Sequence, residues 1–159
     1  DQLSTAMSVR QHHSHTTTQI KSQLPDAVIF AKSTDDVAAV VAVNPYGEVY
    51  GADGVAIGVS TAPASVRAAG AYAGTATMPG TNTTIGSVLT NATLTKSEAL
   101  KVSQMAHDGL ARAVRPAHTL YDGDTLFTAA TCKLGAVDVN RLGMLAADAV
   151  EQAIRAALP

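Results

Sequence analysis

The sequence contains no tryptophan, and aromatic residues make up only 4% of its 159 residues. Charged residues are also scarce, at 15%, and the formal net charge is −2. A chain without a basic excess lacks the electrostatic attraction that nucleic acids and anionic membranes exert on their partners. We therefore expect neither nucleic acid nor a membrane as a partner. Hydrophobic residues amount to 47%, many of them alanine, which favours one domain with closely packed layers of sheet and helix.

Cysteine is almost absent. The single residue, Cys132, cannot form an intramolecular disulfide, which indicates a reducing compartment. Because Cys132 follows an apolar, strand-like run over residues 125–131, we predict a small buried side chain rather than a reactive thiol. The sequence also lacks an apolar run of membrane-spanning length and, at its N-terminus, the apolar core of a signal peptide. These absences predict a cytoplasmic protein.

The first 36 residues carry few large apolar side chains, so we predict irregular structure there. His12, His13 and His15 lie in this segment, and imidazole is a common metal ligand. The three residues are nearly consecutive, however, and no cysteine or carboxylate lies close by to complete a site. A solvated polar segment accounts better for them, and we expect neither a metal nor another cofactor.

Small apolar and β-branched residues at 37–43 predict a strand buried on both faces. Residues 44–47 have the composition of a turn, and residues 48–50 return to an extended pattern. We therefore predict a hairpin that presents Asn44 at a strand end. An asparagine at the start of a turn usually bonds its own backbone, so these residues alone favour a structural role for Asn44.

Thr83 and Thr84 stand before a second apolar run of strand length, after a Pro-Gly turn at residues 79–80. This pattern is typical of a hydroxyl nucleophile held at the head of a buried strand. A threonine-rich strand without a catalytic role has the same composition, so the pattern alone does not decide. Residues 51–80 are rich in small residues and proline, and they predict a long connection with one short strand at 55–59.

Thr95 and Glu98 have the spacing of a capping box, which predicts that a helix starts there. An apolar stripe at helical spacing, including Leu100, Met105 and Leu110, indicates that this helix ends shortly before a proline. A second helix is predicted at the C-terminus, capped by Asp138 or Asn140 and lined on one face by Leu142, Leu145, Ala146, Ala149, Ala153, Ile154 and Ala157.

Four polar side chains near these elements are candidates for chemistry. His107 and Asp108 fall on the first helix, where adjacent residues do not face each other, so we predict a polar face or a hydrogen-bonded histidine rather than a catalytic pair. Asp122 and Asp124 flank Gly123, and glycine lets the backbone fold so that both carboxylates converge. A calcium loop would use similar residues, but the rest of its ligand series is missing. A plain β-turn is the alternative that the residues leave open.

Several motifs in one order resemble a known family. They lie at residues 82–86, 90–92, 94–96, 105–113, 115–119 and 122–127, beginning with Asn-Thr-Thr-Ile-Gly and ending with Asp-Gly-Asp-Thr-Leu-Phe. Together they resemble the self-processing N-terminal-nucleophile hydrolases, which include nylon hydrolase (endo-type 6-aminohexanoate-oligomer hydrolase), the L-aminopeptidase/D-esterases and the β-peptidyl aminopeptidases. The resemblance runs in register from about residue 37 to the C-terminus. It implies an α/β fold of the αββα sandwich type.

In this family the precursor cleaves itself before a serine or threonine, which then heads a β-chain as its N-terminal nucleophile. The resemblance places the cut between Asn82 and Thr83. Residues 1–82 would then be an α-chain-like segment and residues 83–159 a β-chain-like segment, together forming one domain. Thr83 would attack the carbonyl carbon of Asn82 during processing and the substrate amide during turnover.

The resemblance also assigns the supporting groups. The family asparagine at the end of a Val-Ala-Val strand corresponds to Asn44, which would donate to the oxyanion and so reverses the role favoured above. The paired acidic residues of the family correspond to Asp122 and Asp124, which would orient the amine and the hydroxyl of Thr83. No metal or cofactor is implied.

The implied activity is the hydrolysis of linear amides, such as 6-aminohexanoate oligomers or peptides, through an acyl-enzyme. A threonine nucleophile preceded by asparagine places the chain closer to the nylon-hydrolase branch than to the aminopeptidases. Two alternatives stay open: an exo-acting aminopeptidase of the same family, and a non-catalytic assembly subunit. Because family members assemble into tetramers or larger rings, we expect a homo-oligomer of cleaved units.

The sequence departs from the family pattern in two respects. Family precursors have a longer segment before the cut, which predicts that a large N-terminal part of the α-chain is absent from this sequence. The family also uses a lysine beside a glycine-rich segment. Neither Lys21 nor Lys32 has that context, so no catalytic lysine is assigned.

Overall fold

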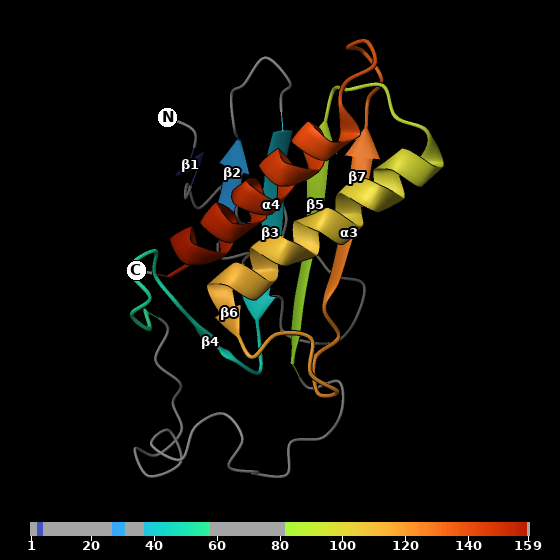
Figure 1. The fold of residues 1–159 in the computed structure, drawn as a ribbon. Coiled ribbons are helices and arrows are strands. Elements are labelled where there is room, and N and C mark those ends of the chain that lie inside the picture. Colours follow the sequence, from blue (N-terminus) through green and yellow to red (C-terminus); the bar gives the residue numbers. More distant parts are fainter. Residues whose placement is uncertain (1–2, 5–26, 31–36, 58–81, 159) are drawn as a thin grey trace, which may run out of the picture.

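Five strands form one sheet in the computed structural model, which describes residues 3–4, 27–30, 37–57 and 82–158. They are β1 (Leu3–Ser4), β2 (Ala27–Phe30), β3 (Val37–Asn44), β5 (Thr83–Thr90) and β7 (Thr125–Ala130), and they lie in that order across the sheet (Figure 1). Neighbouring strands are antiparallel except β5 and β7, which run parallel. Residues from both sides of the predicted cut therefore contribute to one sheet.

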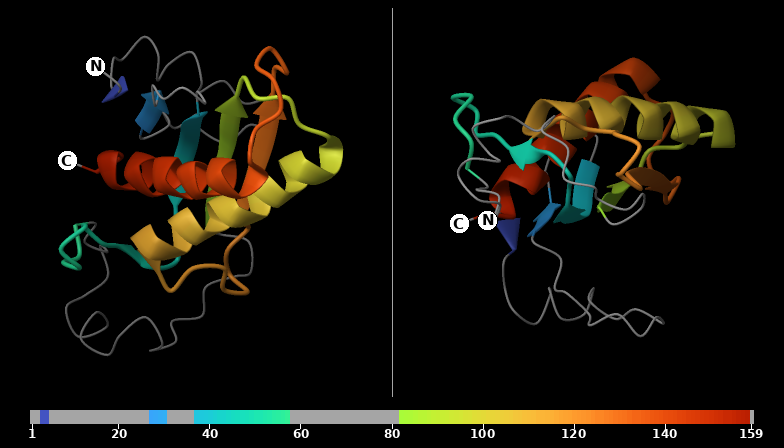
Figure 2. Two further views of the ribbon diagram at one scale, coloured as in Figure 1. Left: turned by 45° about the horizontal axis from the view of Figure 1, so that its top comes forward. Right: turned by 90° about the horizontal axis from the view of Figure 1, so that it is seen from below.

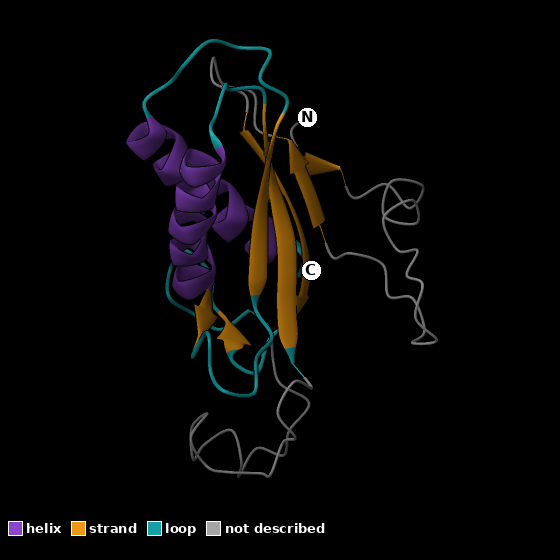
Figure 3. Ribbon diagram, turned by 90° about the vertical axis from the view of Figure 1, so that its right-hand side faces the viewer, coloured by secondary structure: helices purple, strands orange, loops and turns teal. Residues whose placement is uncertain are grey.

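Two helices cover one face of this sheet. α3 (Lys96–Ala113) and α4 (Val139–Ala156) lie side by side across the strands, and both lie on the same side of the sheet (Figures 2 and 3). A small sheet of β4 (Glu48–Val49) and β6 (Val114–Arg115) lies at the end of α3. Within the part of the chain that the structure describes, neither helix is long and apolar enough to cross a membrane.

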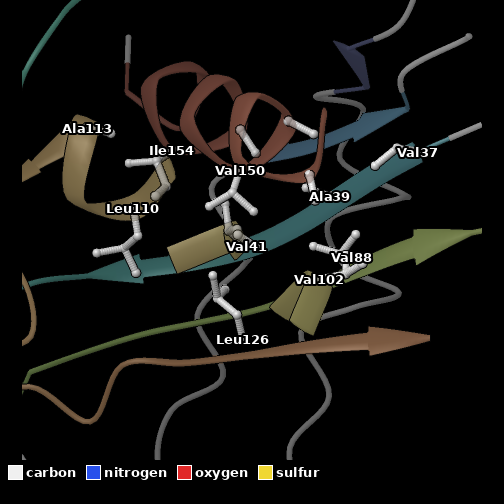
Figure 4. Close-up of a cluster of buried hydrophobic side chains, with 14 of the residues drawn as sticks. Val37, Ala39, Val41, Val88, Val102, Leu110, Ala113, Leu126, Val150 and Ile154 are labelled. Atoms are coloured by element: carbon white, nitrogen blue, oxygen red, sulfur yellow. The ribbon is translucent and has the colours of Figure 1, made fainter. Parts of the chain in front are cut away.

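The core lies between the helices and the sheet, where valine, leucine and alanine side chains meet (Figure 4). On β3, Val37, Ala39 and Val41 are at most 1% exposed, whereas the side chains between them are half-buried. The predicted strand is confirmed, but the prediction that both of its faces are buried is wrong. Among the described residues, helices cover one face of the sheet, which is the usual arrangement for antiparallel strands.

The predicted hairpin after β3 is also wrong. Glu48 and Val49 pair with Arg115 and Val114 of β6, not with β3. The chain leaves the sheet at Gly47, where an added Cβ atom would lie 2.1 Å from the carbonyl oxygen of Pro116. This close approach redirects the segment toward the end of α3. The predicted strand at 55–59 lies partly outside the described residues. Its described part, residues 55–57, forms one isolated bridge, between Ala56 and Tyr50.

Both predicted helices are confirmed, with their caps. Thr95 caps α3 through a complete capping box with Glu98, and the carboxylate of Asp138 accepts a hydrogen bond from the amide of Asn140 at the start of α4. The expected stripe on α3 was partly wrong, because Leu100 is 60% exposed. The other predicted residues Val102, Ala106, Leu110 and Ala113 are buried, together with Ser103 and Gly109.

Cys132 does not have the predicted buried side chain. β7 ends at Ala130, one residue before the end of the predicted run, and Cys132 lies exposed in the connection to α4. Its φ angle of 54° is in the left-handed region, where a strand cannot continue. The prediction extended the strand by one residue too many.

The two helices approach each other closely at Gly109. A Cβ atom at this position would lie 2.0 Å from the carbonyl oxygen of Ala147 on α4. No real contact is that short, so a side chain here would force the helix backbones apart. Gly143 on α4 faces Met105 in a similar way, but there the nearest atom is the sulfur, at 2.3 Å.

We expect Gly109→Ala to destabilise the protein by about 1–3 kcal/mol, the usual effect of overpacking. Alanine is better in a helix than glycine by ~1 kcal/mol, so the clash with the backbone of Ala147 decides the sign. Gly143→Ala is the matched control, because the flexible side chain of Met105 can turn away from the added methyl group. Urea unfolding measures both variants, and equal free energies of unfolding would contradict the close packing of the helices.

Candidate active site

Thr83 and Asn44 lie opposite each other in the sheet. Thr83 is the first residue of β5 and Asn44 the last residue of β3, and they are direct partners in the antiparallel ladder. Directly opposite residues point to the same face, with their Cβ atoms roughly 5 Å apart. The structure therefore brings the predicted nucleophile together with the predicted oxyanion donor, on the face of the sheet opposite the helices.

Thr84 points the other way, into the core. Its side chain is 0% exposed, and its hydroxyl has no hydrogen-bond partner within the described part of the chain. A substrate that arrives from solvent cannot meet this hydroxyl. Of the two threonines, only Thr83 is placed to react with one.

Hydrogen bonds hold the peptide bond between Asn82 and Thr83 from several sides. The carbonyl oxygen of Asn82 accepts a hydrogen bond from the amide of Gly123 at 2.8 Å, and the Thr83 hydroxyl lies 2.5 Å from the same oxygen. On the other side, the Asn82 side chain donates to the carbonyl of Pro45 at 3.2 Å. The amide of Asn82 donates to Tyr121 at 3.4 Å. The Thr83 hydroxyl therefore lies against a carbonyl group that a backbone amide already polarises.

The space at Gly123 is too small for any side chain. A Cβ atom here would lie 2.8 Å from the hydroxyl oxygen of Thr83, which is shorter than any ordinary carbon–oxygen contact. The sequence suggested a conformational reason, a sharp fold between two acidic residues. The structure gives a steric one, since among the described glycines only Gly54 has a positive φ angle.

Asp122 joins two segments beside the Asn82–Thr83 bond. One carboxylate oxygen accepts from the amide of Tyr46 at 2.9 Å, and the other accepts from the amide of Thr119 at 3.1 Å and from its hydroxyl. The rings of Tyr46 and Tyr121 pack with their centroids 5.2 Å apart. Asp122 thus fixes the turn before β7 to the end of β3.

Asp124 holds the chain just after Thr83. One oxygen accepts from the amide of Thr84 at 2.8 Å, and the other accepts from the amide of His118 at 3.2 Å and lies 3.0 Å from its Nδ1 atom. The side chain is only 3% exposed. Asp124 therefore contacts the start of β5 through a backbone amide, whereas Asp122 bonds the segments beside it. The predicted role of both carboxylates at the amine and hydroxyl of Thr83 stays a prediction.

Two histidines beside Asp124 were not predicted as part of the site. The Nδ1 atom of His107 lies 3.3 Å from the Nε2 atom of His118. Burial lowers the pKa of His107 below its ordinary value, and the neighbouring His118 lowers it further. Asp108 is exposed, so the expectation that it forms no pair with His107 agrees with the structure. The contact between the two rings crosses from α3 to the turn before β7, which is why helical spacing did not reveal it.

Groups of three or more histidine, cysteine or acidic side chains in a metal-binding arrangement do not occur within the described ranges. His12, His13 and His15, for which a metal role was weighed, lie outside the described residues, as do Lys21 and Lys32.

Sequence comparison identifies the family. The profile of Peptidase family S58 matches residues 22–159. The chain belongs to peptidase family S58. It is 38% identical over 129 residues to an uncharacterized aminopeptidase of Mycobacterium leprae (strain TN), covering 76% of this chain and 35% of that relative. A second uncharacterized aminopeptidase, of Mycobacterium tuberculosis (strain ATCC 25618 / H37Rv), is 52% identical over 58 residues, which are 36% of this chain and 16% of that relative. The chain thus spans about a third of the length of the first relative.

Two solved structures have a fold similar to that of this chain. The L-aminopeptidase D-Ala-esterase/amidase of Ochrobactrum anthropi, a variant of the Ntn-hydrolase fold, superposes with a TM-score of 0.55 at 15% identity, over 82% of this chain and 38% of that one. The PH0078 protein of Pyrococcus horikoshii OT3 gives 0.52 at 21% identity, with the same coverage. The predicted α/β class and Ntn-hydrolase type are confirmed. The described residues supply one sheet and one helix layer of it.

Proposed function

We propose that this S58 chain cleaves itself between Asn82 and Thr83 and then hydrolyses amides with Thr83 as its N-terminal nucleophile. One observation carries the proposal. The Thr83 hydroxyl lies 2.5 Å from the carbonyl oxygen of Asn82, and the amide of Gly123 donates to that same oxygen at 2.8 Å. A nucleophile beside a carbonyl that already accepts a hydrogen bond is the arrangement that acyl transfer needs.

Self-cleavage begins when the Thr83 hydroxyl oxygen attacks the carbonyl carbon of Asn82. Negative charge develops on the carbonyl oxygen, where the Gly123 amide stabilises it. The amide nitrogen of Thr83 takes up a proton and leaves, so that an ester replaces the peptide bond. Water then hydrolyses the ester, which releases the carboxylate of Asn82 and restores the hydroxyl.

Turnover uses the amine that this cleavage creates. An α-amine has an unperturbed pKa of about 7.7–8.0, so near neutral pH it can accept the proton of the Thr83 hydroxyl. The hydroxyl attacks the substrate carbonyl, Asn44 donates to the oxyanion from the opposite strand, and the amine returns the proton to the leaving group. Water hydrolyses the acyl-enzyme. Asp122 and Asp124 keep the start of β5 in place for both steps.

The substrate class follows from the family and the motifs. We propose small linear amides, either 6-aminohexanoate oligomers or peptides, turned over by a homo-oligomer of cleaved units in the cytoplasm. The relatives are named aminopeptidases, which supports the exo-acting alternative equally well. A non-catalytic assembly subunit is the alternative from outside the enzymes, and self-cleavage separates it from both.

Thr83→Ala is expected to abolish self-cleavage, because the methyl side chain has no oxygen to attack the carbonyl of Asn82. Intact mass spectrometry of the purified protein measures this: two chains divided before Thr83 in the wild type, and one uncut chain in the variant. A variant that still divides at Asn82 would show that Thr83 is not the nucleophile. An uncut wild type without amidase activity would favour the assembly subunit.

Gly123→Ala is expected to slow self-cleavage by about tenfold or more, since a misplacement of ~1 Å can cost about 100-fold in rate. The added methyl group, 2.8 Å from the Thr83 hydroxyl oxygen, forces that hydroxyl to turn away from the carbonyl. Gly135→Ala is the control, because an added Cβ atom there meets nothing within 4 Å. The measurement is the rate at which the precursor band disappears, and equal rates for the two variants would refute the geometry.

A blocked substrate separates endo from exo action. An exo-acting aminopeptidase needs the free amino end of its substrate, whereas an endo-acting hydrolase needs only an internal amide. We expect the N-acetylated form of a 6-aminohexanoate oligomer to be hydrolysed at a rate within about threefold of the free form, because blocking removes no contact with the amide that reacts. Loss of turnover on acetylation, measured by release of free amines, would assign the aminopeptidase activity instead.

A further inference from the structure

A line of polar contacts runs from α3 to the residue after the nucleophile. His107 on α3 contacts His118 at 3.3 Å, His118 contacts Asp124 at 3.0 Å, and Asp124 accepts from the amide of Thr84 at 2.8 Å. The amide of Thr84 is the peptide group that follows Thr83. Any movement of Asp124 therefore moves the backbone of the nucleophile.

The contact with Asp124 gains importance once the chain is cut. Before cleavage, the bonds of Asn82 to Gly123, Tyr121 and Pro45 also hold Thr83 in place. After cleavage, Asn82 is no longer joined to Thr83, so these bonds no longer restrain it. The sheet ladder and the bond from Asp124 to the Thr84 amide are the restraints that remain. The group that orients Asp124 then orients the nucleophile.

His118 has an unusual backbone conformation at its contact with Asp124. Its φ angle is 56°, in the left-handed region, which residues other than glycine and asparagine adopt at some cost. In this conformation both its amide and its Nδ1 atom meet the same oxygen of Asp124, at 3.2 and 3.0 Å. Two nitrogen atoms of one residue thus meet the same carboxylate oxygen, which limits how far the carboxylate can turn.

The ring of His107 contacts the second ring nitrogen of His118. The Nδ1 atom of His107 lies 3.3 Å from the Nε2 atom of His118, and the centroids of the two rings are 4.8 Å apart. The ring of His118 is therefore held between Asp124 and α3. The charged groups that face the pair are Asp124, before β7, and Asp108, on α3.

We infer that His118, steadied by His107, is a positioning residue that orients Asp124 and through it Thr83. This inference rests on the proposed function. The Nδ1 atom and the backbone amide of His118 meet one oxygen of Asp124 at 3.0 and 3.2 Å, and His107 limits the turning of the ring at its other nitrogen. Without the ring, the carboxylate keeps its backbone donors but is free to turn.

Two variants of His118 test this. His118→Gly accepts the left-handed backbone without strain and keeps the amide donor, but it removes the ring. His118→Asn also tolerates this backbone and places an amide N–H near the former Nδ1 atom. The rate of self-cleavage is the first readout, since it reports on Thr83 before any substrate binds. Steady-state kinetics of the cut protein give kcat and KM separately.

We expect His118→Gly to lower the self-cleavage rate and kcat by about tenfold with KM within about twofold, as befits a lost orientation rather than a lost substrate contact. His118→Asn should restore most of the rate, because its side-chain amide replaces the lost ring contact with Asp124. Urea unfolding of both variants shows that they are folded.

The outcomes separate this inference from the proposed function. A wild type that is never cut would refute the proposed function. A wild type that is cut, with folded His118 variants that match its rates, would refute only the role of His118. If the glycine variant does not fold, His107→Ala decides alone, because it removes the ring that steadies His118: a folded variant with the self-cleavage rate and kcat of the wild type would overturn the inference.

Discussion

The antiparallel register between β3 and β5 is the constraint on which the candidate site depends. Buried residues of the two strands face each other in pairs, with Ala39 opposite Val88 and Val41 opposite Gly86. Because side chains alternate along a strand, a slip by one residue would turn the whole apolar row away from the helices. Packing of the core therefore also fixes the row on the other face, and Asn44 is held opposite Thr83 by residues that take no part in the chemistry.

The parallel pairing of β5 with β7 adds the remaining groups. Parallel strands begin at the same edge of a sheet, so the segment before β7 lies beside the segment before β5. Asn82 and Asp122 form a bridge of the same parallel sense, and the amide of Gly123 reaches the carbonyl of Asn82 from there. The site thus combines the end of one strand with the starts of two others, and the sheet itself sets their distances.

Sequence patterns predicted what neighbouring residues determine. The capping box at Thr95 and the apolar periodicity gave both helices, because helix starts and stripes are local features. The motif resemblance supplied Asn44 and Thr83, whose contact no spacing could reveal. Long-range contacts caused the failures: the approach of Gly47 to Pro116 removed the hairpin, and the bond from the Gly123 amide to Asn82 joins segments 41 residues apart in a chain whose local pattern suggests only a turn.

Residues on one face of the sheet form the core, and residues on the other face form the candidate site, with one exception. Thr83 and Asn44 lie on the face opposite the helices, so their side chains contribute little to the core, and effects of substitution on rate can be interpreted without loss of the fold.

Asp124 is the exception. Its carboxylate is only 3% exposed, and a buried charge is tolerated because N–H groups surround it. Replacing it would disturb the fold and the site together. His118, whose side chain is 39% exposed, places its Nδ1 atom 3.0 Å from that carboxylate. A substitution of its ring therefore changes the surroundings of the carboxylate from the surface, while the backbone amides of Thr84 and His118 still donate to it.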